Sequence, residues 1–317
     1  MNNIEDVFDE NKIKKAIIKA KLKLILKIII VSIIVFVVGV YINMRICMKY
    51  SERAYEANNA YVELAVPNGY ISESNDIFGF LGGSGTYKVA KEIGGKTVIL
   101  KDGISLFGIS PPMNYSRGRG GGYHVADEWP VSLWEYGYKK MRFFHPELKY
   151  KEYQNDLENI QSIPDGKIIE MAISFDKPHS MHEMDVIQYE LKTVNVTWAW
   201  LDEFETKKID EFKDEIENSD AKANGIYEDD IVGISISDKY FIGYNQQYDE
   251  LLDKLKKSHF IDHKNLYEEI MKRGKTSEDD AKVLGIVVQG TKKELSELKG
   301  NPMIKATSIG IVADELY

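Results

Sequence analysis

The pattern of apolar and charged residues divides the chain into a short basic segment, one long apolar run and a large mixed remainder. From Ile28 to Met44 no residue is charged, and the run extends back to Leu22 if the Lys27 side chain reaches toward lipid headgroups. The extended run has roughly 20 residues, which is enough to cross a bilayer as a helix. We therefore predict a transmembrane helix over residues 27–46.

The flanks of this run decide between an anchor and a cleaved signal peptide. Arg45, Ile46, Cys47 and Met48 follow the run, and they are not the small residues that signal peptidase or lipoprotein processing requires. The residues before the run include Lys12, Lys14, Lys15, Lys19, Lys21, Lys23 and Lys27. This positive charge predicts a cytoplasmic N-terminus, a single pass through the plasma membrane and an extracytoplasmic remainder.

Residues 1–26 form the predicted cytoplasmic stub, which is long enough for one helix. Asn11 suits its N-cap, and apolar residues at helical spacing form one stripe between the lysines. An alternative is that the membrane helix simply continues, with the lysines setting topology and contacting anionic lipid. If the stub instead binds a partner protein, the stripe and the acidic-apolar cluster before it are the candidate contacts. These residues are Val7, Phe8, Ile13, Ile17, Ala20 and Leu24.

The remainder predicts a stalk and a β-rich region over residues 47–150, followed by an α+β region over 151–317. Residues 51–61 suit a helical stalk, and two β-rich arms around Gly94-Gly95 predict a hairpin. Two later stretches, "KIIEMAISFDKPHSMHEMDVIQYELKTVNVTWAWLDEF" and "AKVLGIVVQGTKKELSELKGNPMIKATSIGIVADEL", share one β-α-β plan. Two such units commonly combine as a ferredoxin-like sandwich.

Two further elements are predicted inside the α+β region. One amphipathic helix is expected from about Asp249 to Lys272, and "DIVGISIS" predicts a strand. Trp198 and Trp200 alternate with smaller residues as strand residues do, which favours packing within a sheet.

Composition excludes several functional classes. The formal net charge of -9 argues against nucleic-acid binding, and a single cysteine among 317 residues excludes intramolecular disulfides and Cys-rich zinc modules. Gly95-Lys96-Thr97 resembles the end of a P-loop, but Ala90 stands where that motif needs glycine. Since no G-x-S-x-G elbow appears either, we expect no catalytic residues, no enzyme activity and no cofactor.

Two groups of residues could nevertheless hold a ligand. Arg117, Arg119 and His124 lie in a Gly-rich stretch where guanidinium and backbone N–H groups could bind an anion. The second group is histidine-rich, but the H-E-x-x-H pattern of zincins is absent, so no metal is expected. The histidine-rich group comprises His179, His182 and Glu183 in one stretch and His259 and His263 in another.

The chain resembles the sigma factor regulator family. The resemblance rests on the basic stub with one span, on "EMAISFDKPHSMHEM" and "VTWAWLD", and on the closing "VLGIVVQGTKKELSELKGNPMIKATSIGIVAD". It covers about residues 10–105, and it is stronger over residues 150–315. The motifs are turns and strands and carry no catalytic signature.

The resemblance implies a membrane-anchored anti-sigma factor that holds an extracytoplasmic-function sigma factor inactive and releases it on envelope stress. Many anti-sigma proteins carry a cytoplasmic zinc-binding His-Cys-Cys domain, whereas this chain has no His or Cys before Cys47. The sigma contact would therefore be the segment from about Val7 to Leu24. The expected partners are this sigma factor, the lipid bilayer, and a second membrane protein or a further copy of the chain. The alternative function is that of a membrane-anchored external sensor or ligand-binding protein without a sigma partner.

Overall fold

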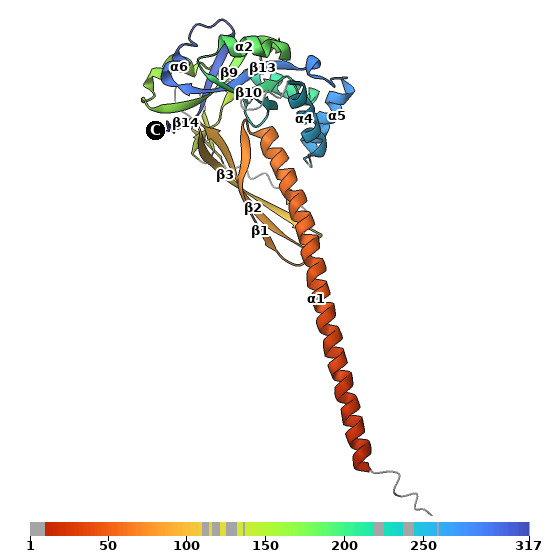
Figure 1. The fold of residues 1–317 in the computed structure, drawn as a ribbon. Coiled ribbons are helices and arrows are strands. Elements are labelled where there is room, and N and C mark those ends of the chain that lie inside the picture. The colour runs from red at the N-terminus through yellow and green to blue at the C-terminus, as the bar shows by residue number, and fades with distance from the viewer. Residues whose placement is uncertain are drawn as a thin grey trace, which may run out of the picture.

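A computed structural model describes residues 10–109, 114–115, 121–124, 132–135, 137–218, 225–236, 244–258 and 260–316; for 10, 114–115, 121–124, 132, 135 and 244–246 it describes the backbone alone. Its first described element is one unbroken helix, α1 (Glu10–Ala65), which contains residues 10–26 of the stub, the apolar run and the stalk. At 1.5 Å per residue a helix of 56 residues is about 84 Å long. Figure 1 shows α1 running away from the rest of the molecule.

Three long strands follow α1 and form an antiparallel meander with one short additional strand. The strands are β1 (Gly69–Phe78), β2 (Gly82–Ile93), β3 (Lys96–Gly108) and β4 (Asn114–Tyr115), in that order across the sheet. The predicted hairpin is confirmed: Gly94 and Gly95 have φ values of 56° and 79°, as the tight turn between β2 and β3 requires. The meander lies alongside the last part of α1 (Figure 1).

A five-stranded antiparallel sheet forms the C-terminal part and confirms the predicted α+β class. Its order is β12-β10-β13-β9-β14. The first predicted unit comprises β9 (Lys167–Ser180), α2 (Met184–Glu190) and β10 (Asn195–Leu201). The second comprises β13 (Lys282–Thr291), α6 (Lys292–Ser296) and β14 (Ile304–Asp314). Because β13 separates β9 from β10, and β9 separates β13 from β14, the four strands have the ferredoxin-like order. The predicted strand in "DIVGISIS" is β12 (Gly233–Ser235), at the edge.

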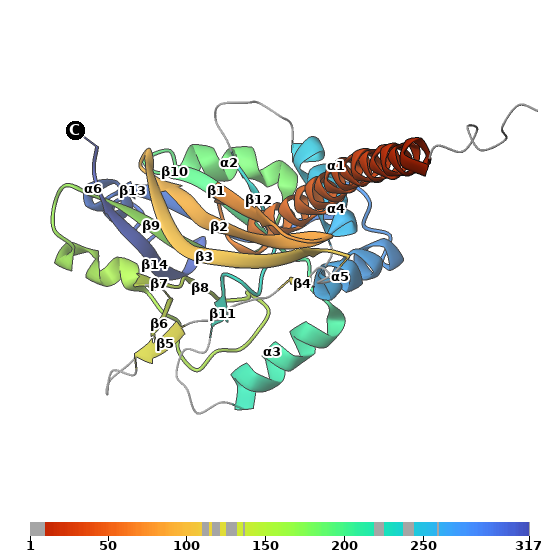
Figure 2. The same cartoon turned by 90° about the horizontal axis from the view of Figure 1, so that it is seen from below.

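Both faces of this C-terminal sheet are buried, which explains its nearly continuous apolar strands. One face carries Met171 and Ile173 and packs against α2, α6 and the later helices. The other carries Trp198 and Trp200, which are both buried, and packs against Phe143 and α3 (Thr206–Asn218). In Figure 2 α2 and α3 lie on opposite sides of the molecule.

The prediction of a single amphipathic helix from Asp249 to Lys272 is wrong in one respect, because this segment forms two helices. These are α4 (Tyr244–Lys257) and α5 (Ile261–Lys272). The Ser258 hydroxyl accepts a hydrogen bond from the Phe260 N–H at 3.3 Å, so a side chain takes the donor that a continuing helix would use. The break lets both helices lay their apolar sides on the same core.

The remaining described elements are short; some lie between the two sheets along the chain and others lie within the C-terminal part. The strands are β5 (Gly121–His124), β6 (Ser132–Glu135), β7 (Tyr138–Lys139), β8 (Arg142–Phe143) and β11 (Ile226–Tyr227). Three 3-10 helices are η2 (Asp156–Ser162), η3 (Met181–Glu183) and η4 (Glu278–Asp280).

The close packing of the central strand β13 generates a stability prediction. A Cβ at Gly285 would lie 2.4 Å from the Ile173 carbonyl oxygen and 3.2 Å from Cε3 of Trp200. Gly285→Ala should therefore lower the free energy of unfolding by about 1–3 kcal/mol. The measurement is denaturant unfolding of the full chain in detergent, followed by tryptophan fluorescence. Gly290→Ala in the same strand is the control, because its Cβ would meet only side-chain atoms, at 3.3 Å. Equal loss in both variants would contradict this explanation.

Candidate functional site: the N-terminal helix and its joint

Residues 10–26 of the stub form the first turns of α1, and their apolar stripe is free of contacts with the rest of the described chain. Ile13, Ile17 and Leu24 are 41 to 60% exposed, and Ala20 is exposed as well. Their spacing of three and four residues places them on one side of the helix. Val7 and Phe8 lie outside the described residues. The structure thus presents the stripe on a helix surface and leaves its partner as a prediction.

The same helix passes through the apolar run without a break. Among the described residues it is the one helix that is long and apolar enough to cross a membrane, and none of its apolar window is buried against other elements. A bare apolar surface on an isolated helix is what a lipid-facing span requires. The run is therefore a membrane anchor.

Beyond the anchor, α1 packs against both sheets. Ala54, Ala57 and Asn58 are buried, and Val62 and Val66 pack with Val89 of the meander. Leu64 belongs to the core of the C-terminal sheet. The C-terminal end of the helix that contains the anchor therefore lies inside the fold.

Polar contacts hold the end of α1 in the same position. Lys254 of α4 forms an ion pair with Glu63 at 2.7 Å, and the centroids of the Tyr61 and Phe260 rings lie 4.4 Å apart. Just after the helix, the Asn68 amide donates to the Thr197 hydroxyl of β10 at 2.7 Å. The end of α1 is thus bonded to α4 and, through Asn68, to β10 of the C-terminal sheet.

A buried cluster of three charged side chains joins the meander to the C-terminal sheet. The Lys91 ammonium of β2 lies 3.2 Å from Oε1 of Glu170 in β9 and 2.9 Å from Oε2 of Glu228, which follows β11. All three side chains are almost completely buried. We call Lys91, Glu170 and Glu228 the charged joint. Sequence reasoning missed it, and the one signal was a glutamate in the middle of the apolar strand "KIIEMAISF".

Burial and the neighbouring charges act in opposite directions within the charged joint. Burial raises the pKa of Glu170 and the Glu228 carboxylate adds to that rise, whereas Lys91 lowers it; the pKa stays above its ordinary value. For Lys91 burial favours the neutral amine, but the two carboxylates outweigh it and raise its pKa. The ammonium is thus the charge that holds two carboxylates together.

Hydrogen bonds around the β2–β3 turn complete the connection between the sheets. The Gly94 N–H donates to Oε1 of Gln289 at 3.0 Å, and Nε2 of Gln289 donates to the Glu92 carbonyl at 2.8 Å. A Cβ at Gly94 would lie 2.7 Å from the Ile168 side chain, so glycine also allows the close approach. One end of the meander is therefore fixed to β9 and β13.

Of the candidate ligand residues, the structure describes the side chains of His179, His182, Glu183 and His263. Arg117, Arg119 and His259 lie outside the described residues, and only the backbone of His124 is described, in β5. His179 lies 3.7 Å from both Asp176 and Glu183, while His263 bonds to the Ser258 hydroxyl. The anion site at Arg117, Arg119 and His124 therefore stays a prediction, and His179 and His263 belong to two separate sets of contacts.

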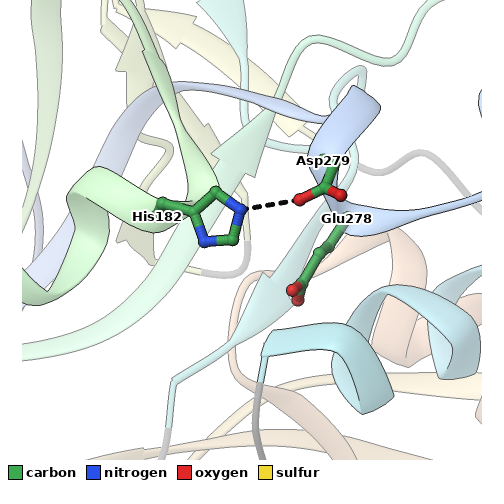
Figure 3. A group of neighbouring side chains, drawn as sticks. All are labelled: His182, Glu278 and Asp279. Atoms are coloured by element: carbon green, nitrogen blue, oxygen red, sulfur yellow. Dashed lines mark hydrogen bonds and ion pairs between the residues drawn. The ribbon is translucent and has the colours of Figure 1, made fainter.

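His182 forms the one group with metal-ligand chemistry among the described residues. Its Nε2 lies 2.6 Å from the Asp279 carboxylate, and ligand atoms of His182, Asp279 and Glu278 lie within 4.8 Å of one another (Figure 3). A nitrogen and carboxylate oxygens suit Zn²⁺ or Mn²⁺. The His182 nitrogen is already engaged by Asp279, so the arrangement is a hydrogen-bonded contact between η3 and η4 that a metal would have to break.

The architecture defines a class: a single-pass protein whose membrane helix ends in the core of an α+β body. Comparison with family models makes the assignment specific. Residues 14–98 match the sigma factor regulator N-terminal model, and residues 160–311 match the sigma factor regulator C-terminal model. The chain belongs to the sigma factor regulator family. No curated protein and no solved structure matches it significantly.

The family assignment sets the class of function. Its two domains indicate an anti-sigma factor role, with a sigma factor as partner, and the family is regulatory rather than enzymatic. The first matched segment contains α1 from residue 14 and Lys91, and the second contains Glu170 and Glu228. The charged joint therefore connects the two family regions.

Removing the cation of the charged joint should be costly. Lys91→Met leaves two carboxylates buried beside each other without a counter-charge, and we expect a loss of about 3–5 kcal/mol in the free energy of unfolding. Denaturant unfolding of the full chain in detergent measures it. Lys88→Met removes an exposed lysine of the same strand, which pairs with Glu73, and should cost far less because water screens that pair. Similar losses in both variants would contradict the role given to Lys91.

The raised pKa of Glu170 predicts a pH dependence of the joint. The folded state holds this proton at pH values where the unfolded state, with the ordinary pKa of 4.5, has lost it. The contribution of Glu170 to stability should therefore fall as pH rises from 4.5 through the raised pKa. Hydrogen exchange of β2 amides measures this local stability after correction for the intrinsic exchange rate.

A matched pair of variants isolates the group responsible. Glu170→Gln should flatten the pH profile at β2. Glu203→Gln should leave that profile unchanged, because Glu203 is also buried but pairs with Lys275, at 3.2 Å. A native profile that is already flat would disprove the assignment.

Proposed function

We propose that this protein sequesters an extracytoplasmic-function sigma factor through its N-terminal stub and releases it when its external part responds to envelope stress. The stub would lie in the cytoplasm, because the lysines precede the apolar run, and the two sheets would lie outside. Val7, Phe8, Ile13, Ile17, Ala20 and Leu24 remain the proposed contact residues.

The observation that carries the proposal is the continuity of α1. One helix from Glu10 to Ala65 contains the stripe, the anchor and the segment buried between the two sheets. A helix without a break or hinge transmits tilt and rotation along its length. A change at the charged joint or at the end of α1 would thus reach the stub without a second messenger.

The stub also has a size that suits a regulated contact. A helix of this length buries an area toward the low end for stable complexes, below about 800 Å² per partner, so its affinity would be modest. Attachment to the membrane compensates by raising the effective concentration of the stub near its partner. Such a contact can be released by a small movement or by proteolysis in the stalk.

The test is co-purification of cytoplasmic partners by the full-length protein and by Ile13→Asp/Ile17→Asp. We expect a sigma factor with the native protein and its loss with the double variant, because two carboxylates would be buried in an apolar groove. Recovery of a sigma factor with both proteins would disprove the stripe as the contact. Recovery with neither would favour the alternative, an external sensor without a sigma partner.

A closely matched pair of single variants gives the affinity version of the test. Ile17 and Ile18 are adjacent and 49% and 57% exposed, but a helix turns by about 100° per residue, so Ile18 lies off the stripe. Ile17→Asp should weaken binding of the captured sigma factor by about tenfold or more, and Ile18→Asp by less than about twofold. Equal weakening of binding by both variants would show that the added negative charge, and not its position on the stripe, reduces the affinity.

A further inference from the structure

The end of the meander nearest the anchor has an exposed apolar surface. Phe80 is 80% exposed in the turn between β1 and β2, and Ile77 is 68% exposed near the end of β1. Leu106 and Ile109, at the end of β3, are also exposed. We call Ile77, Phe80, Leu106 and Ile109 the hairpin tip. Exposed apolar side chains gathered in one place mark a binding surface more often than single ones do.

The hairpin tip is fixed to α1 at the end of the apolar run. The Asn43 amide donates to the Gly79 carbonyl at 2.9 Å, and its Oδ1 accepts from the Leu81 N–H at 2.6 Å. The buried Cys47 thiol donates to the carbonyl oxygens of Gly79 and Gly82 at 3.6 and 3.4 Å. The tip is thus placed beside Asn43, one residue before the last uncharged position of the run.

Further contacts bind parts of the turn's backbone. The Gly79 N–H donates to the Gly82 carbonyl at 2.7 Å, and the Ile109 N–H donates to the Leu81 carbonyl at 2.8 Å. Together with the bonds from Asn43, they give protein partners to the N–H and C=O groups of Gly79 and Leu81. Irregular backbone at membrane depth needs such internal partners, because hydrocarbon offers none.

The strands run along α1 and therefore place each residue at a definable depth. Gly79 bonds to Asn43 and Asp76 bonds to the Ser51 hydroxyl, so three residues back along β1 correspond to eight residues, about two turns, of α1. Phe80 and Ile109 lie level with the apolar run. Ser84 pairs with both Ile77 and Leu106, so these two residues lie one step further out, between the levels of Asn43 and Ser51. Arg45 and Lys49 belong to this part of α1 and suit the headgroup region.

We propose that the hairpin tip inserts into the bilayer leaflet from which α1 emerges, so that the protein enters the membrane at two neighbouring places. Lipid is the occupant because the tip is continuous with the lipid-facing surface of the anchor and hydrogen-bonded to it. The insertion fixes the tilt of α1 relative to the bilayer. The opposite end of the same strands carries Lys91, so the meander connects the membrane surface to the charged joint.

Site-specific fluorescence tests the insertion in the full chain. Cys47→Ser keeps a hydroxyl donor and removes the native thiol, after which Phe80→Cys takes an environment-sensitive NBD label. Ile99→Cys is the matched control. Ile99 is an exposed isoleucine of β3 that pairs with Ala90, at the end of the meander far from the hairpin tip. Each labelled protein is placed singly in nanodiscs of phosphatidylglycerol and phosphatidylethanolamine. A second tip label, Ile109→Cys, covers the case in which the first variant fails to fold.

Lipid-attached doxyl groups should quench the Phe80 and Ile109 labels several-fold more than the Ile99 label. Aqueous iodide should quench the Ile99 label several-fold more than the tip labels. Equal iodide quenching at all three positions would overturn the proposal. Protection from iodide without doxyl quenching would assign the tip to protein, and protection that requires two copies in one disc would assign it to a second copy.

Discussion

The end of α1 lies between two sheets, and this burial organises the rest of the structure. The helix stops at Ala65 because Pro67 disfavours helical backbone in the residue before it. Asn68 then takes a left-handed φ of 59°, and Gly69 follows with Val66 so close that a Cβ would lie 2.6 Å away. This sharp turn sends β1 back along the helix. The meander, its contacts with α1 and its contact with the C-terminal sheet all depend on that reversal.

The charged joint is an unusual way to hold two sheets together. Removing three charges from water costs more than an apolar contact of the same size would, unless each charge finds close partners. Lys91 has two carboxylates, and Glu170 also accepts from the Ile311 N–H at 3.4 Å. Such a joint is specific, because the sheets fit in one relative position, and it is sensitive, because protonation of one carboxylate changes its balance. A regulatory protein needs both properties more than it needs maximal stability.

Local pattern predicted much of this fold. The anchor, the hairpin at Gly94-Gly95 and the two β-α-β units each follow from residues that are close in sequence, so periodicity and turn chemistry were sufficient. The break between α4 and α5 depends on one hydroxyl, that of Ser258, which an apolar periodicity does not detect. The charged joint could not be predicted, because Lys91 lies 79 residues from Glu170 and 137 from Glu228. The stub residues stay a prediction, since their contacts involve a partner outside the chain.

The unbroken course of α1 has a consequence for how its length can vary. A helix turns by about 100° per residue, so each inserted or deleted residue in the apolar run would rotate the stripe at Ile13 and Ile17 around the helix axis relative to the two sheets. Two full turns need about seven residues and leave a mismatch of only ~20°. The length of the run therefore sets the rotational position of the stripe, in addition to anchoring the chain. Its composition is free within the limits of hydrophobicity, but its residue number determines which way the stub faces.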